Sequence, residues 1–428
     1  MRRGLRRCYV ALGAVVVLGV CRSLATEALA QWAPAASDAE NPAIAYSATE
    51  PADAVARLQR AIDSGKTLPF DRRHGYLPAV LRELNVPVSS QGLVFSRTSF
   101  QRDLISPARP RALYFNRDLY VGWVPGSATI EIAAVDPTLG AVFYTLAQNA
   151  AAPPRFERQT RACLRCHDSA SATAGVPGLI MKSVSTDGEG EPIASAGADV
   201  MSDRTPMHKR WGGWYVTGTH GAQPHMGNAI GVRPPGGTPF DAGPYLSSHS
   251  DLVALTVLAH QSHVQNLLTR VGYRTRMALY FDRQRNAELG RSRDDVPEPT
   301  RRLIERVAEP LVRALVFVDE APLVEPVAGT SGFSDAFAQQ GPRDHRGRSL
   351  FELDLTRRLL RYPCSYLIYS AAFDALPAPA REYVYGRLWE VLSGKDASQT
   401  FAHLSHADRA DILEILLDTK PEFAAYAP

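Results

Sequence analysis

Cys163-Leu164-Arg165-Cys166-His167 is the stretch from which the rest of the chain can be interpreted. Two thiols three residues apart share one helical turn, where each can bond a vinyl group of the same porphyrin. The adjacent histidine can then supply an axial ligand to iron. This C-x-x-C-H spacing is typical of covalent c-type haem attachment. We therefore expect one covalent haem c, bound through Cys163 and Cys166, with His167 on the iron.

Three other interpretations of this stretch remain open. A zinc half-site would need two more ligands nearby, and the sequence has no second cysteine pair. A thioredoxin-like redox pair should follow a strand in a βαβ unit, and that context is missing. Chance co-occurrence of the five residues is the third alternative.

The N-terminus predicts an export signal over residues 1–30. Four arginines precede an apolar run from Cys8 to Cys21, which is too short to span a bilayer comfortably. Ala28-Leu29-Ala30 offers a cleavage site, and Ser23-Leu24-Ala25 a second one. An uncleaved anchor, or a lipoprotein with Cys21 as acceptor, is a less favoured alternative. We expect a periplasmic or otherwise exported protein whose mature chain is soluble.

The amino-acid composition and charge of the chain limit the kinds of binding partner that are expected. The 428 residues are 45% hydrophobic and 21% charged, as in an ordinary globular protein. Five of the arginines and only one glutamate lie in residues 1–30, so the remaining chain is close to neutral. Such a chain has no basic field for nucleic acid, and we expect a redox partner protein instead. Cys364 is left over and is expected to be a buried helical thiol.

The fold class expected is α+β, mainly α, with a small antiparallel sheet before a loop-rich haem segment and a helical C-terminal part. Period-2 apolar patterns predict strands within residues 93–147. The organisation predicted comprises a signal peptide (1–30), a linker (31–48), an α+β N-terminal region (49–150), a haem-binding region (151–245) and a mainly helical C-terminal region (246–428).

Residues 199–228 combine aromatic, glycine, histidine and methionine residues within sixty residues of His167. We expect this segment to form the far wall of the haem pocket, with Trp211 and Trp214 against the ring. His220 and His225 are the first candidates for a second iron ligand, and Met207 and Met226 come next. An open sixth position, or an aromatic mini-core with surface histidines, is the alternative.

Helical patterns dominate after residue 246. Apolar spacing predicts an amphipathic helix over 250–271 with Ser250 as its cap. His260 continues its inward stripe and His263 lies one turn on, so both are candidates for metal or haem ligation, against a simpler role in the core. Further helices are predicted over Leu350–Leu360 running on to Phe373, over Ala380–Leu392 and over His406–Asp418.

The stretch from Cys163 to Leu179 resembles c-type cytochromes, because Pro177-Gly178-Leu179 follows ten residues after the histidine. In that family a proline carbonyl accepts the Nδ1–H of the haem histidine, which implies this role for Pro177. More loosely, the mature chain is similar to large exported bacterial proteins described as cytochrome c domain-containing. That resemblance runs through Pro110–Asn116, Arg210–Gly218 and Tyr362–Ser370. The sequence differs from small class I cytochromes because it is several times longer and has no long amphipathic helix just before Cys163.

Three functions follow from these expectations. The first is electron transfer by an exported single-haem c-type protein. The second is a periplasmic haem oxidoreductase, peroxidase- or dehydrogenase-like, with an open iron site. The third is a haem-based sensor module. The nature of the sixth iron position would discriminate between them.

Overall fold

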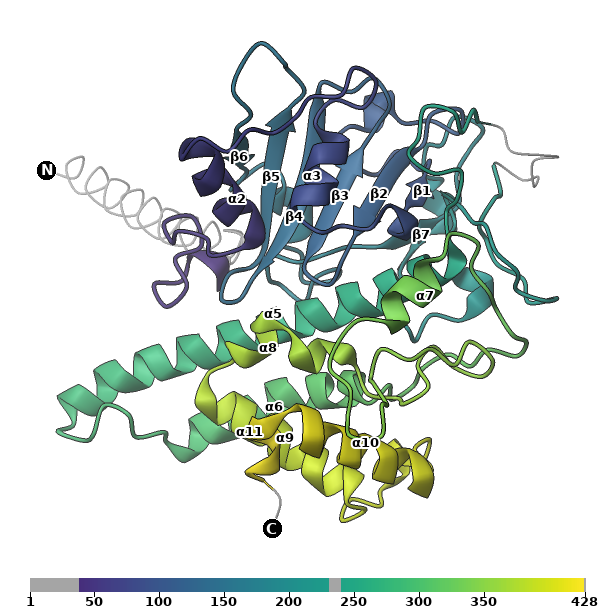
Figure 1. Cartoon of the computed structure of the whole chain (residues 1–428). Helices are drawn as coiled ribbons and strands as arrows, with labels where there is room; N and C mark the ends of the chain where they lie inside the picture. The colour runs from purple at the N-terminus through teal and green to yellow at the C-terminus, as the bar shows by residue number, and fades with distance from the viewer. Residues whose placement is uncertain (1–37, 231–239, 427–428) are drawn as a thin grey trace, which may run out of the picture. The chain divides into compact units, whose positions relative to one another are not determined.

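A computed structural model describes residues 38–230 and 240–426 (Figure 1). The predicted signal peptide, with both of its cleavage sites, therefore lies outside the described residues. The fold is α+β, as the sequence predicted, with an antiparallel sheet followed by a helical C-terminal part.

The main sheet has the strand order β6-β5-β4-β3-β2-β1-β9, and every neighbouring pair is antiparallel. Its strands are β1 (Gly92–Val94), β2 (Arg111–Phe115), β3 (Leu119–Trp123), β4 (Thr129–Asp136), β5 (Gly140–Ala147), β6 (Phe156–Arg158) and β9 (Trp214–Tyr215). The strands predicted within 93–147 are confirmed. The sheet extends beyond them, because β6 and β9 on either side of the haem segment add to its two edges.

Alternation along β4 gives the sheet two different faces. Ile130, Ile132 and Ala134 point into a core shared with α2 (Ala54–Asp63) and α3 (Leu77–Glu83). These two helices cover that face in Figure 1. Glu131 and Ala133 point to the opposite face, which the haem segment and α5 (Leu252–Glu288) cover.

The expected linker over 31–48 is packed from Asp38 onward. The Tyr46 side chain is fully buried, and its hydroxyl donates to the Ala141 carbonyl at 2.9 Å. The Arg158 guanidinium lies over the Tyr46 ring, 4.8 Å from its centroid. Because this stretch is rich in alanine, sequence inspection missed that three of its residues are buried in the hydrophobic core. They are Ala39, Ile44 and Tyr46. Asp53 caps α2 by accepting the amides of Val55 and Ala56.

The helix predicted over 250–271 continues to Glu288 as α5. Its cap is Asp251, whose carboxylate accepts the amides of Val253 and Ala254, whereas Ser250 binds the Tyr215 carbonyl and the Leu93 amide. Ser250 thus fastens the sheet to the start of α5. None of the helices within the described ranges is long and apolar enough for a membrane crossing.

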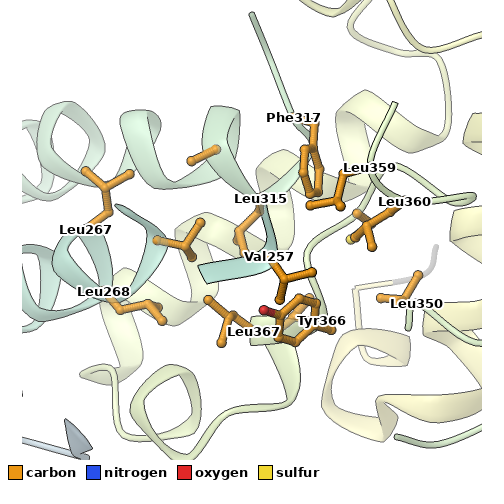
Figure 2. Packing of buried hydrophobic residues seen from close by; sticks show 14 of the residues in the cluster. Val257, Leu267, Leu268, Leu315, Phe317, Leu350, Leu359, Leu360, Tyr366 and Leu367 are labelled. Carbon is orange, nitrogen blue, oxygen red and sulfur yellow. The ribbon is translucent and has the colours of Figure 1, made fainter. Parts of the chain in front are cut away.

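The C-terminal part packs further helices against α5. They are α6 (Glu298–Leu315), α7 (Phe333–Ala338), α8 (Ala371–Asp374), α9 (Ala378–Leu392), α10 (His406–Thr419) and α11 (Pro421–Ala424). Figure 2 shows how Val257 from α5, Leu315 from α6 and Leu367 meet in this core. The helices predicted over 380–392 and 406–418 are confirmed as α9 and α10, and Ser405 caps α10 in a capping box.

The helix predicted over Leu350–Leu360 is wrong. Leu355 has a left-handed φ of 58°, and its amide donates to the Arg358 carbonyl, which folds the stretch back on itself. Leu350, Leu359 and Leu360 are buried all the same (Figure 2). The apolar spacing therefore indicated correctly that these side chains are buried, but not that the stretch is helical. An irregular segment can also insert side chains into a core.

Candidate haem-attachment site

The predicted attachment motif lies on a single helical turn, α4 (Leu164–His167), which follows β6 across the second face of the sheet. The His167 amide donates to the Cys163 carbonyl at 3.0 Å, which closes the turn. Residues three apart share one face of a turn, so both thiols are available to one flat ligand. Cys166 is exposed, whereas Cys163 is half-buried against the main core.

His167 has one ring nitrogen committed and one uncommitted within the described part of the chain. Its Nδ1 lies 2.8 Å from the Gly178 carbonyl oxygen, and the Gly178 amide donates back to the His167 carbonyl at 2.8 Å. Burial, more than any charge, lowers the pKa of His167, so the ring is neutral at pH 7. A neutral imidazole that donates through Nδ1 presents the Nε2 lone pair, which is the form that ligates iron.

The carbonyl that fixes His167 is Gly178 and not Pro177, the residue implied by the cytochrome resemblance. The Pro177 carbonyl accepts the Ala141 amide of β5 at 3.1 Å. Successive carbonyls of an extended chain point in opposite directions. Because Pro177 is bridged to Asp168 in antiparallel register, its carbonyl faces the sheet and the next one faces the histidine.

Asn266 of α5 holds this acceptor segment in place. Its Oδ1 accepts the Leu179 amide at 2.7 Å, and its Nδ2 donates to the Leu179 carbonyl at 2.8 Å. A Cβ at position 178 would lie 2.4 Å from Asn266 Oδ1 and 2.9 Å from the Thr173 Cβ. Only glycine fits there, so the close approach of helix and loop positions the carbonyl that orients His167.

Two opposite charges lie beside the motif. Arg111 on β2 and Glu131 on β4 form an ion pair of 2.6 Å on the face of the sheet that the motif covers. Burial, with a smaller contribution from Glu131, raises the pKa of the Cys163 thiol to about 11 against the opposing effect of Arg111. The same two residues act in opposite senses on the pKa of His167. Sequence inspection did not single out this pair.

The two histidines expected on the far side of the iron contact each other. The rings of His220 and His225 are 4.5 Å apart in an edge-to-face arrangement, and His220 Nδ1 lies 2.9 Å from the Gln223 carbonyl oxygen. Burial, followed by the nearby His220, lowers the pKa of His225 to about 4. In residues 38–230 and 240–426, no recorded contact joins either ring to His167.

The expected aromatic wall is part of the protein core. Trp211 is fully buried with a left-handed φ of 66°, and its ring lies 5.4 Å from that of His225. The Trp214 indole nitrogen donates to the Lys182 carbonyl at 2.8 Å. Trp214 itself stands on β9, whereas Lys182 begins a separate strand pair, and the charge of Lys182 contributes to lowering the pKa of His167. That pair is β7 (Lys182–Val184) and β8 (Ala198–Val200).

Neither candidate methionine has a recorded contact with His167 within the described ranges. Met207 is half-buried against the main core. The sulfur of Met226 lies 3.7 Å from the Ser183 hydroxyl oxygen. In the described part of the chain, no recorded contact with His167 is made by any of the four candidate ligands, His220, His225, Met207 and Met226.

His260 belongs to a different cluster, which sequence inspection did not find. Its Nδ1 lies 3.3 Å from Asp203 Oδ1 and its Nε2 lies 2.8 Å from the Ser365 hydroxyl, while its ring stacks on Phe317 at 4.2 Å. Burial alone would raise the pKa of Asp203, but the hydrogen bond from His260 and the charges of His260 and His263 lower it overall.

This Asp-His-Ser order has the connectivity of a catalytic triad but not its access. Asp203, His260 and Ser365 are at most 2% exposed, so no substrate could meet the serine. The cluster instead links the segment after β8 to α5 and to the 3-10 turn Tyr366–Tyr369, which Ser365 caps. His263 is half-buried beside it, and burial lowers its pKa. Neither histidine is placed at the attachment motif.

One further group could hold a cation on geometry alone. Asp344, His345 and Asp418 bring their ligand atoms within 4.8 Å of one another. His345 and Asp418 are at the surface and already bind each other, and Asp344 is held by Arg348. This group is a surface ion-pair network far in the chain from the cysteine motif.

Comparison with known proteins adds nothing to this geometry: no family model, no curated protein and no solved structure matches the chain.

Proposed function

We propose that this chain is an exported c-type haem protein that carries electrons through one covalent haem. Cys163 and Cys166 would form the two thioethers, and His167 would ligate the iron through Nε2. The observation that carries the proposal is the neutral His167 ring, fixed through Nδ1 by the Gly178 carbonyl beside two thiols on one turn. Bound there, the haem would supply a one-electron redox centre.

The rival interpretations of the motif have less support. A zinc site needs four ligands, and within the described residues the three-ligand group that could hold a metal is Asp344, His345 and Asp418, not the cysteine turn. A thioredoxin-like pair needs a nucleophilic thiolate, and burial of Cys163 raises its thiol pKa to about 11, which disfavours that form.

The proposal includes export and a redox partner protein. The basic and apolar pattern of residues 1–30 supports translocation, and c-type haem suits an extracytoplasmic protein because the cofactor cannot be lost by dissociation. The close-to-neutral charge of the remaining chain favours a protein partner over nucleic acid.

A second candidate function is a haem oxidoreductase with an open sixth position. His220 supports it, because its Nδ1 is held by the Gln223 carbonyl, and because neither its ring nor that of His225 contacts His167 among the described residues. An iron without a second protein ligand could bind a small substrate such as a peroxide.

The deciding experiment is expression with c-type haem maturation machinery, followed by spectra of the oxidised and reduced protein with and without CO. The proposal expects haem staining after denaturing electrophoresis, and loss of that stain when Cys163 and Cys166 are both replaced by serine. A low-spin spectrum indifferent to CO supports the carrier. High-spin iron that consumes peroxide supports the oxidoreductase, and CO binding without turnover supports a sensor. Absence of covalent haem in the parent protein would falsify all three.

The second-ligand prediction has its own variants. His220→Ala and His225→Ala should each be compared with His208→Ala, which alters an exposed histidine of the same segment. A conversion from low to high spin in only one of the first two variants would identify that residue as the ligand. Identical spectra in all three would exclude both.

A further inference from the structure

The charged pair beside the attachment motif is built around a glycine. Arg111 and Glu131 stand on β2 and β4, with Gly122 of β3 between them and paired with Glu131 in the register. A Cβ at Gly122 would lie 2.0 Å from Arg111 Nη2. The arginine therefore lies across β3 to reach the carboxylate, and a side chain at position 122 would displace it from this path.

The pair is partly withdrawn from water and incompletely satisfied. The Arg111 and Glu131 side chains are 18% and 14% exposed. Among the described residues, Arg111 Nε and Glu131 Oε1 are both buried without a hydrogen-bond partner. Their neighbours on the same sheet face, Leu113 and Ala133, are apolar. Burying an ion pair in such surroundings gains little stability over an apolar pair, so the charges call for another explanation.

The location supplies that explanation. Cys163 packs against the core on this face, and the His167 ring lies 4.7 Å from that of Phe143 on β5, the strand next to β4. Arg111 and Glu131 stand on β2 and β4 of this same face, so the charged pair and the motif lie on one side of the sheet.

We propose that the Arg111–Glu131 pair is the charged wall of the haem site, and that its two members shift the redox potential of the bound iron in opposite directions. The inference rests on the proposed function, since it requires haem at Cys163 and Cys166. Reduction adds one negative charge to the iron centre. Glu131 therefore opposes reduction and Arg111 favours it, and the two nearly balance only while both are charged. They act as positioning and electrostatic residues, without ligating iron.

The test is a potentiometric titration of haem-loaded variants at pH 7. Glu131→Gln should increase the equilibrium constant for reduction about tenfold, because it removes the negative member of a partly buried pair and leaves the Arg111 charge uncompensated. Arg111→Gln should decrease it by a similar factor, and the double variant should return close to the parent value. A purely structural role would shift both single variants in the same direction.

A matched control is Glu309→Gln, which breaks a comparably buried pair with Arg387 between α6 and α9. It should change the reduction equilibrium less than twofold. Arg111→Lys, which keeps the charge, should stay near the parent and covers the case in which Arg111→Gln fails to fold.

The possible outcomes distinguish a failure of the proposed haem function from a failure of this inference alone. Parent protein without a haem stain overturns the proposed function, whatever the pair does. Stained protein in which Glu131→Gln shifts reduction by less than twofold, or in the same direction as Arg111→Gln, overturns this inference alone. Opposite shifts with near-cancellation in the double variant support it.

Discussion

Two buried histidines of this chain show how the same side chain serves different ends. His167 uses Nδ1 for the Gly178 carbonyl and keeps Nε2 uncommitted among the described residues. His260 uses both nitrogens, for Asp203 and Ser365, and stacks its ring on Phe317. A histidine with both nitrogens bonded can only hold the fold together, whereas one that is oriented through a single nitrogen is prepared for a ligand.

The regions around them differ in the same way. The attachment turn lies in a loop-rich segment with an exposed thiol and unpartnered polar atoms nearby, at Arg111 and Glu131. The His260 cluster lies in the closed helical core, where its ring stacks on Phe317, a residue labelled in Figure 2. Buried polar atoms without a hydrogen-bond partner occur in both regions, because Asp203 Oδ2 is also unpaired among the described residues. The exposure of Cys166, compared with the full burial of His260, therefore distinguishes the first region as the candidate binding site.

The largest expected effect separates the two histidines by spectrum. His167→Ala should remove the axial ligand and shift the haem absorption completely to that of a form lacking it, while His260→Leu leaves the spectrum per haem unchanged. Absorption spectra of the two purified proteins make the comparison. A normal spectrum in His167→Ala would show that another residue holds the iron.

The second prediction is that, for the free energy of unfolding, replacing His260 has a larger effect than replacing His167. His260→Leu should lower the free energy of unfolding by about 3–5 kcal/mol, because Asp203 is left as an uncompensated buried charge. His167→Ala in the haem-free protein should cost only about 1 kcal/mol, the net value of one hydrogen bond. Urea unfolding followed by circular dichroism measures both, with His208→Ala as an exposed control. Equal losses in the two variants would contradict the comparison.

The third prediction concerns the link between the two regions, Asn266. Asn266→Ala leaves the buried amide and carbonyl of Leu179 unpaired and should cost about 2 kcal/mol. Hydrogen exchange should quicken at residues 177–179 more than in β4. Gln284→Ala, an exposed change on the same helix, is the control. Unchanged exchange at 177–179 would mean that α5 does not position the histidine acceptor.

The smallest effect is a pH dependence in the helical region. Burial raises the pKa of Glu320 to about 7, above its ordinary value of 4.5. The folded state therefore binds the proton more tightly, so this contribution to stability is complete below pH 4.5 and is lost as the pH rises through 7. Glu320 alone should contribute a loss on the order of 2 kcal/mol between pH 5 and 8. The lowered pKa values of His167, His225 and His263 change the stability in the opposite sense over the lower part of this range.

Glu320→Gln should abolish this slope, and urea unfolding at several pH values would measure it. Asp203 does not interfere, because its pKa is lowered and its contribution is lost only in acid. Glu298→Gln, an exposed change on α6, should retain the slope. Persistence of the full slope in Glu320→Gln would assign it to another group.

Local patterns were sufficient for much of the fold. Alternating strands within 93–147 and capped helices such as α10 depend on neighbouring residues, so their existence could be predicted. The apolar stretch Leu350–Leu360 has the spacing of a helix but packs as an irregular chain, because its left-handed Leu355 depends on the core around it. The packed start of the chain, at Tyr46, likewise depends on partners about a hundred residues away.

The candidate site likewise has one part that the local sequence predicts and another that depends on tertiary packing. The sequence alone was sufficient to propose Cys163, Cys166 and His167 as an attachment motif, because the chemistry of that motif is contained in five consecutive residues. Only the tertiary structure decided that Gly178 and not Pro177 orients the histidine, that His220 and His225 contact each other, and that Arg111 meets Glu131 across Gly122. Each of these depends on strand register or helix packing that joins distant segments, and no local pattern encodes it.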